Sequence, residues 1–415
     1  MNSVNGTTES GLEYRFVLSG AELAIQPTVL EIPLEENDYE KLLQWQGEGG
    51  AFSAVASAGG FSLPCQLSGF GLDGNTETLT PRRSLFVLVQ NVPDAGTDGH
   101  LFQLERHEEP DDADEPLSRK QGVYLDHQPE NARVVVRIEG KLFTRYLYSR
   151  DMMKPYFYPM IGPHAKTLIQ DAPDDHLHHH GLWWGHDQVN GHQAYHEFAK
   201  EGRQSHSRFL HLTGGPVFGQ LSVCIDWLSN KGERLLQEVR TMRIFNLPPE
   251  QRYVDVHSEL LATDGTVVFG PTKEGGFPFI RVNEQMCAFL SGTITSSTGK
   301  KGEGEIFGTE ADWVDYSGSI LNVSWNNGIP DKGFFNGGIA IMVHPDYRAF
   351  STKWFVRDAG AFTSSNFHFW GGHTLPSGDS LGFRQRIYLH LGDVEAGKVK
   401  DRYREYANPE VPDWC

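Results

Sequence analysis

Histidines gather in one short stretch of this chain. Five of the 18 histidines fall within the eleven residues from His176 to His186, beside Trp183 and Trp184. Imidazole can serve as base, acid or metal ligand near neutral pH, so this density predicts a functional site. A purification tag is disfavoured, because the histidines stand in mid-chain among Asp, Trp and Gly and form no terminal homopolymer.

The spacing of the cluster leaves two kinds of chemistry open. In an extended segment alternate side chains share a face, so three histidines would lie together and Asp175 would lie opposite. Those three could ligate one divalent metal ion, with Asp175 or Glu274 orienting them or completing the shell. Without a metal, one histidine would act as general acid, a second would polarise a sugar oxygen, and a carboxylate elsewhere would be the base. The candidate metal ligands are His176, His178 and His180.

A lysine and a glutamate outside the cluster are further candidates. Lys154 precedes Pro155, which favours an extended backbone, and an aromatic run follows. Its ammonium could donate to a substrate oxygen or stabilise an enolate-like charge, or its stem could simply cover an aromatic ring at the surface. Glu274 lies in a glycine-containing loop, where a catalytic carboxylate and an exposed ion pair are the two alternatives. The predicted catalytic residues are Lys154, His176, His178, His179 and Glu274.

Planar and aromatic side chains suggest what the site would bind. Arginine forks suit a carboxylate or vicinal sugar oxygens, and tryptophan faces stack on pyranose rings. Each has a structural alternative, because arginines often form surface ion pairs and tryptophans often fill the core. Loop histidines are pocket candidates as well. The residues predicted on these grounds to bind substrate are Trp183, Arg281, His344, Trp354, Arg357 and His373.

Several of these segments together resemble the bacterial family labelled methane oxygenase PmoA-like. The resemblance covers roughly residues 130 to 395 and rests on Lys154-Pro155-Tyr156-x-x-Pro159, Gly162-Pro163, the Asp175–Trp183 pattern, Val189-Asn190-Gly191, Lys273–Gly276 with Arg281, Asp312–Gly318, and His344-Pro345 with Trp354 and Arg357-Asp358. It implies a soluble β-sandwich protein of sugar-degrading bacteria, of a kind found among carbohydrate-processing enzymes. It also adds Asn190 to the predicted substrate-binding residues. The family usually has arginine where this chain has His180, which makes His180 the weakest member of the cluster.

The net charge of the chain and the motifs that it lacks disfavour several classes of partner and cofactor. The 415 residues carry a formal net charge of −18, which disfavours nucleic acid, an anionic membrane surface and a strongly anionic polymer, although a local cationic pocket could still hold one carboxylate. No apolar stretch approaches the roughly 18 residues of a membrane span. The nucleotide-binding glycine motifs are absent, so no nucleotide cofactor is expected. The N-terminus lacks the pattern of a signal peptide, which favours the cytoplasm, or the periplasm if a leader was removed. The widely spaced cysteines are expected to be unpaired and reduced.

Alternating patterns and turn signals predict an all-β fold. Residues 133–139 with 141–148, 220–227 with 236–245, and 253–261 with 266–269 read as hairpins, and residues 380–391 as a late strand. Helices are expected only near residues 37–43 and 394–407. The sequence thus predicts a large antiparallel two-sheet sandwich, for which the supersandwich of galactose-mutarotase-like proteins is one form. A smaller N-terminal β module over residues 1–118 would end in an acidic loop, and residues 119–415 would form the sandwich with its C-terminal helix.

These observations favour a carbohydrate-active enzyme, a lyase or hydrolase acting on a glycoside or an oxidised sugar. Its partner would be a small carbohydrate, with tryptophans holding the ring and a histidine or metal-bound water moving protons. A copper-dependent oxygenase and a non-catalytic carbohydrate-binding protein are the alternatives. The sequence gives neither the sugar, the bond cleaved, the metal nor the oligomeric state.

Overall fold

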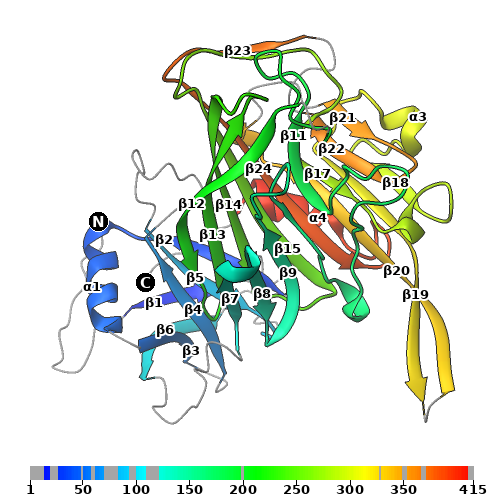
Figure 1. Cartoon of the computed structure of the whole chain (residues 1–415). Coiled ribbons are helices and arrows are strands. Elements are labelled where there is room, and N and C mark those ends of the chain that lie inside the picture. Colours follow the sequence, from blue (N-terminus) through cyan, green and yellow to red (C-terminus); the bar gives the residue numbers. More distant parts are fainter. Residues whose placement is uncertain are drawn as a thin grey trace.

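The chain folds into large antiparallel sheets. The computed structural model describes residues 14–18, 27–47, 50–57, 61–69, 83–92, 100–108, 121–197, 201–326, 329–347, 353–365 and 371–409. The structure is all-β, with 54% strand and 11% helix, and its sheets pack in a sandwich-like arrangement (Figure 1). The predicted fold class is therefore confirmed.

Sheet I carries the elements that matter most for the site. Its eight strands run in the order β21-β22-β17-β11-β10-β9-β8-β7. They are β7 (Val123–Gln128), β8 (Arg133–Ile138), β9 (Lys141–Leu147), β10 (Tyr156–Phe157), β11 (Leu182–His186), β17 (Gly275–Arg281), β21 (Lys353–Val356) and β22 (Ala361–Ser365).

Sheet II lies against one face of sheet I. Its eight strands run in the order β12-β13-β14-β15-β24-β20-β19-β18. They are β12 (Arg203–Thr213), β13 (Phe218–Leu228), β14 (Arg234–Phe245), β15 (Gln251–Leu261), β18 (Thr293–Ser296), β19 (Trp313–Asn326), β20 (Ile329–Val343) and β24 (Ser380–Leu391). A separate pair consists of β16 (Val267–Phe269) and β23 (His373–Leu375).

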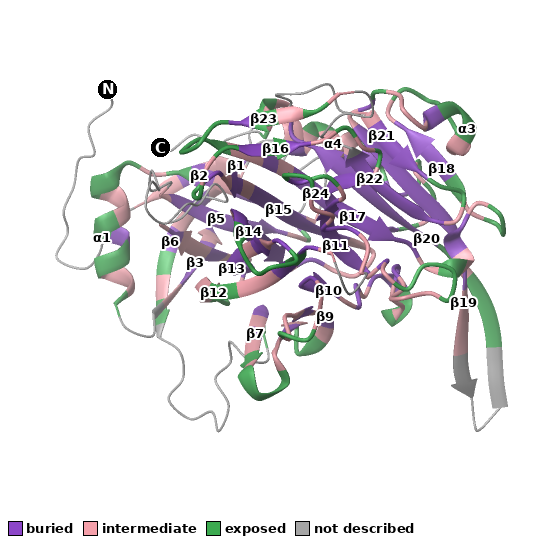
Figure 2. Cartoon of the chain, turned by 45° about the horizontal axis from the view of Figure 1, so that its top comes forward, coloured by how far each residue is buried: buried purple, intermediate pink, exposed green. Residues whose placement is uncertain are grey.

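One apolar core fills the space between the two large sheets. Alternate residues of sheet I, such as Phe157, Leu182 and Trp184, meet Val223 and Ile225 of sheet II in the same cluster. Each large apolar side chain buried in this way contributes roughly 1.5–3 kcal/mol. The buried residues concentrate in these strands, whereas the β19–β20 hairpin extends away from the body (Figure 2). The core thus leaves the opposite face of sheet I free to carry polar chemistry.

The N-terminal strands form a sheet of their own. Its order is β1-β6-β3-β4-β5-β2, and it has its own apolar cluster. Phe86 and Leu88 of this sheet pack on Phe218 and Tyr253 of sheet II. The acidic run over residues 108–116, at which the sequence predicts the end of the N-terminal module, lies outside the described residues except Glu108. The strands and the neighbouring helix are β1 (Arg15–Leu18), β2 (Thr28–Pro33), α1 (Glu36–Gln46), β3 (Gly50–Ala56), β4 (Ser62–Ser68), β5 (Ser84–Val89) and β6 (His100–Glu108).

Two of the three predicted hairpins form. β8 pairs with β9 and β13 with β14, and the late strand is β24. The third hairpin is wrong in its pairing, because β15 lies between β14 and β24 while β16 pairs with β23. β15 is long and almost wholly buried, so it takes a central place that the three-residue β16 could not satisfy.

The described helices are few and short. Besides α1 they are α3 (Gly302–Ile306) and α4 (Val399–Ala407). α4 starts five residues later than the sequence predicts, because Asp393 accepts hydrogen bonds from the backbone of Ala396 and Gly397 and holds a turn there. Cys65, Cys224 and Cys287 are buried free thiols. None of the described helices has the length and apolar character needed to cross a membrane.

Candidate functional site

The site is built on the face of sheet I that points away from the core. Lys154 and Tyr156 lie on this outer face, whereas Phe157 points into the core between the sheets, as expected from extended backbone. Tyr156, Trp183 of β11 and Phe279 of β17 form an apolar layer on the outer face. The loops over residues 158–181 and 187–197 place polar side chains on top of this layer.

The histidine cluster folds into turns, so the predicted extended segment is wrong. The backbone N–H of His176 donates to Pro173 O at 2.9 Å, and that of His179 donates to His176 O at 2.9 Å. These turns set His176 over His179, whose rings stack with centroids 4.5 Å apart. The turns form because Pro173 and the aspartates around it favour them. The predicted single face carrying His176, His178 and His180 therefore does not exist.

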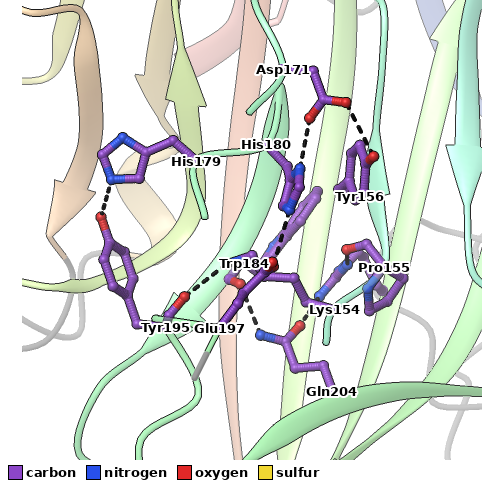
Figure 3. Close-up of polar contacts among 11 residues, drawn as sticks. Lys154, Pro155, Tyr156, Asp171, His179, His180, Trp184, Tyr195, Glu197 and Gln204 are labelled. Carbon is purple, nitrogen blue, oxygen red and sulfur yellow. Dashed lines mark hydrogen bonds and ion pairs between the residues drawn. The ribbon is translucent and has the colours of Figure 1, made fainter. Parts of the chain in front are cut away.

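A chain of alternating charges runs through the site (Figure 3). The Lys154 ammonium lies 3.2 Å from Glu197 Oε1, and the same oxygen accepts from His180 Nε2 at 3.0 Å. His180 Nδ1 donates to Asp171 Oδ1 at 2.6 Å, and the Tyr156 hydroxyl donates to the other oxygen of Asp171 at 3.1 Å. The ring of Tyr156 stacks on His180 with centroids 4.2 Å apart. Because both nitrogens of His180 donate to carboxylates, this ring is an imidazolium and not a free metal ligand.

Burial and neighbouring charges set the protonation of this chain. Burial lowers the pKa of Lys154 from 10.5 to about 8, although Glu197 opposes the change. Burial alone would raise the pKa of Glu197, but the hydrogen bond from His180 and the charge of Lys154 outweigh it and lower that pKa. Burial likewise works against the charged form of His180, and the hydrogen bonds from its ring to Asp171 and Glu197 still raise its pKa. Lys154 is only 2% exposed and donates a hydrogen bond to Tyr195 O at 2.7 Å.

His179 is held in one tautomer. Arg281 can only donate, and its Nη1 lies 3.2 Å from His179 Nδ1, so that nitrogen is the acceptor. His179 Nε2 must then carry the proton and donate to the Tyr195 hydroxyl at 3.0 Å. Burial first, and the neighbouring histidines His178 and His176 next, lower the pKa of His179, so the ring is neutral. His179, predicted to be catalytic, is thus a buried link between Arg281 and Tyr195.

Arg281 is an internal support and not an open fork for substrate. Its Nη2 donates to both oxygens of Asp175, at 3.0 and 2.7 Å, and the side chain is 4% exposed. Burial would raise the pKa of Asp175, but the hydrogen bonds from Arg281 and His176 lower it. Asp175 and His176 are about half exposed, so they form the outer rim of the site.

His178 has the freest ring of the cluster. Its ring contacts those of His179 and His196, with centroids 4.5 and 4.6 Å apart. Neither of its nitrogens has a hydrogen-bond partner among the described residues, and the side chain is partly exposed. Burial, followed by the positive charge of Lys154, lowers the pKa of His178 to about 4, so it is a neutral imidazole at pH 7. Glu274 Oε2 lies 3.9 Å from His196 Nε2 and completes this side of the site.

A buried network in the core holds the floor in place. Arg240 lies 3.7 Å from the centroid of the Trp184 ring and donates to both oxygens of Glu238. It also donates to Pro155 O and to Gln204 Oε1. Gln204 in turn donates to Trp184 O (Figure 3). Arg240 and Glu238 are wholly buried, so their pairing fixes the backbone next to Lys154 with little freedom.

Three residues predicted to bind substrate make contacts elsewhere than at the histidine cluster. Trp354 is fully buried in the core between the sheets and donates to Ala311 O. Arg357 is an exposed partner of Glu303 at 2.8 Å. Asn190 occupies a turn with φ 50°, where its side-chain oxygen accepts from Val268 N.

The other predicted substrate-binding residues divide between the site and elsewhere. Trp183 lies directly beneath the site, fully buried between Phe279 and His179, so its faces are already covered. His344 lies with Tyr406 on the outer face of sheet II and not with the histidine cluster. His373 opens β23, opposite Phe269 of β16.

Among the described residues no group of three or more His, Cys, Asp or Glu side chains is arranged to hold a metal ion. His180 is engaged by two carboxylates, and the ring of His176 lies 5.7 Å from that of His178. The arrangement can move protons and stabilise charge with its own side chains.

Three important residues were not predicted from the sequence. Glu197, Tyr195 and Asp171 link the cluster, yet they lie in loops with no motif around them. Their only signal was nearness to the histidines along the chain. The ring of His196, from the same loop as Glu197, also packs on His178.

Comparison with known proteins places the chain in a family. The model of a family of unknown function, DUF6807, matches residues 133–404. The chain belongs to this family. The matched DUF6807 segment starts at the first residue of β8, ends within α4 and contains every residue of the site. No curated protein matches the chain. The resemblance to the PmoA-like family stays a prediction.

Proposed function

We propose that the protein is a carbohydrate-active enzyme, a lyase or hydrolase that acts on a glycoside or an oxidised sugar at the site on sheet I. One observation carries the proposal. His178 offers a neutral imidazole whose nitrogens have no hydrogen-bond partner among the described residues, and the positive charge of the buried Lys154 ammonium acts on this ring. A base beside a fixed cation is what proton abstraction needs, because the cation stabilises the negative charge that develops.

Elimination uses these groups better than hydrolysis. Retaining and inverting glycosidases use a pair of carboxyl groups, one of which protonates the leaving group. Here Glu197 is engaged by Lys154 and His180, which leaves Glu274 as the carboxylate on the open side. A lyase would instead take the proton next to a carbonyl or carboxylate of the sugar onto His178. The C–H electron pair forms the double bond, and the glycosidic oxygen leaves and takes up a proton.

In this scheme the remaining residues position the reacting groups. His179 and Arg281 hold Tyr195 and Asp175, and the imidazolium of His180 fixes Glu197 against Lys154. Rigid support of this kind keeps the base and the cation in fixed positions relative to each other. Such positioning can lower the activation free energy of the reaction substantially. Leu177, 65% exposed beside His178, gives the mouth an apolar edge for the C–H face of a sugar ring.

The test is a panel of neutral glycosides, uronic-acid glycosides and keto-sugar glycosides. Products are followed as unsaturated sugars by absorbance and as new reducing ends, and identified by mass. We expect an unsaturated product from an oxidised sugar, and none from His178→Gln at an unchanged melting temperature. His127→Gln, which alters an exposed histidine hydrogen-bonded to Tyr148, is the control. Binding without any product across the panel would favour a non-catalytic carbohydrate-binding protein, and activity that needs added copper would favour an oxygenase.

A further inference from the structure

Three arginines gather on the outer face of sheet I, beside the site. Arg133 and Arg137 lie on β8 and Arg145 lies on β9. Arg145 pairs with Val135, so Arg133 and Arg137 flank it diagonally on the same face. Val135 lies on the same face as Arg133 and Arg137 and is only 3% exposed.

Among the residues that the structure describes, none of the three arginines has an acidic partner. Within the described part of the chain no carboxylate lies within 4.0 Å of any of them, and the nearest polar contact is from Arg133 Nε to Gln128 Oε1 at 2.7 Å. Asp126 pairs with Val135 from the next strand and is the one carboxylate in this row of the face. Burial, then Arg133 and Arg137, lower the pKa of Arg145, which reflects the repulsion among the three.

This cluster concentrates positive charge in an acidic protein. The chain has 54 acidic and 36 basic residues. Three unpaired guanidinium groups in one patch repel each other, and a bound anion would relieve that repulsion. The planar guanidinium fork is also the side chain best matched to a carboxylate.

The arginine cluster is in register with the site. Arg145 O accepts from Tyr158 N, and across the sheet Gly181 O accepts from Arg281 N. Tyr158 lies against Gly181, where a Cβ would come within 3.1 Å of its ring and 2.6 Å of Phe157 O. One row therefore runs from Arg145 past Tyr158 to Arg281, over three strand spacings or roughly 14 Å. That distance suits a chain of several sugar units and not a single ring.

We propose that Arg133, Arg137 and Arg145 bind the carboxylates of an acidic oligosaccharide that extends across sheet I from the site at His178. This inference rests on the proposed function and names its substrate class. Strongly anionic polymers were expected to be disfavoured because of the net charge of the whole chain. Binding of an acidic oligosaccharide depends instead on the local electrostatic field of this face. The reacting sugar would lie over His178 and Lys154, and the following uronic-acid units would lie over the arginine cluster.

The test compares two triple variants of the full chain. R133Q/R137Q/R145Q removes the cluster, and R150Q/R203Q/R208Q removes three exposed arginines elsewhere, so that the two variants have the same net charge. The probes are an oligogalacturonate and its methyl ester, measured by calorimetry at low and high salt. We expect the acid form to bind the wild type and the control variant with equal affinity. Its affinity for the cluster variant should be lower by about tenfold or more. High salt should weaken its binding to the wild type. The methyl ester should bind none of them well.

Several results would overturn the inference. These are equal affinity of the two triple variants for the acid, or equal affinity of wild type for acid and ester. Loss of binding to a single-stranded oligonucleotide or a phosphatidylserine vesicle in the cluster variant, with oligogalacturonate binding unchanged, would assign the patch to another partner. If the triple variant unfolds, Arg145→Gln alone is measured in its place. If the acid binds through the arginine cluster but is not turned over, the proposed function is refuted and the inference stands. If neutral glycosides are turned over equally by the wild type and the cluster variant, the inference is refuted and the proposed function stands.

Discussion

Replacement of Lys154 by methionine tests the proposed chemistry most directly. Methionine is an unbranched side chain one atom shorter than lysine, and it removes the ammonium that lies 3.2 Å from Glu197 and 2.7 Å from Tyr195 O. The cation would stabilise negative charge in the transition state more than in the ground state. Its loss should therefore lower kcat and leave KM nearly unchanged.

The structure sets the magnitudes. Loss of one such preorganised donor lowers kcat by about 100- to 1000-fold. Stability should behave differently, because the fall in the Lys154 pKa from 10.5 to about 8 means that the folded protein disfavours the ammonium by about 3 kcal/mol. That figure already includes the attraction of Glu197, so the further loss in the variant is the hydrogen bond to Tyr195 O, about 1 kcal/mol. We expect the free energy of unfolding to stay the same or rise slightly.

The assay is steady-state turnover of the substrate found in the panel, with thermal and urea unfolding of the same samples. Lys141→Met, at an exposed lysine that begins β9, is the matched control and should change neither kcat nor stability. A tenfold higher KM at normal kcat would make Lys154 a simple binding residue. A variant that unfolds easily would show that the ammonium stabilises the fold, and it would refute the reasoning about its burial.

Turnover should fall below about pH 4, as His178 gains a proton, and above about pH 8, as Lys154 loses one. A rate that stays constant above about pH 8 would contradict the role of the ammonium. Stability should also fall in acid. The folded pKa of His178, about 4, lies below its ordinary 6.5, so the unfolded chain binds more protons as pH drops through this window, and His178→Gln should flatten the slope measured by thermal melts. Trp354→Ala should cost roughly 3–5 kcal/mol of unfolding free energy without altering KM, since the ring lies in the core; a raised KM in a folded variant would restore it to the binding site. Arg357→Gln should change stability by less than about 1 kcal/mol in urea unfolding, because its ion pair with Glu303 is exposed.

The strands could be predicted from the sequence because their signals are local. Alternation and a Gly140 turn define β8 and β9, and the same kind of pattern defines β13 and β14. Strand partners are less local. β15 and β16 follow each other along the chain and still join different sheets, because burial of β15 on both faces decides its place. A turn signal alone carries no such information.

The density of histidines indicated the candidate site, but the geometry within it could not be predicted. Alternation would have put His176 and His178 on one face, and it fails because Pro173 and the aspartates around it favour turns. The partners Glu197 and Tyr195 come from the next loop, where no spacing rule connects them to His180 or His179. Contacts between two loops depend on where the sheet places the strand ends that carry them. The register of the strands determines those positions.

Charge balance inside the site explains why the arginine cluster matters. Three cationic and three anionic side chains pair with one another within hydrogen-bond or ion-pair distance, so the paired part of the site adds little net charge. These are Lys154, His180, Arg281, Glu197, Asp171 and Asp175. A site that is neutral in this way could hold a reacting sugar, yet it would not attract an acidic chain toward a protein of charge −18. The unpaired arginines of β8 and β9 supply that attraction on the same face. Neighbouring strands of one sheet would thus select the substrate and catalyse its reaction. Selection would depend on the long-range charge of the arginines, and catalysis would depend on the fixed positions of the buried side chains.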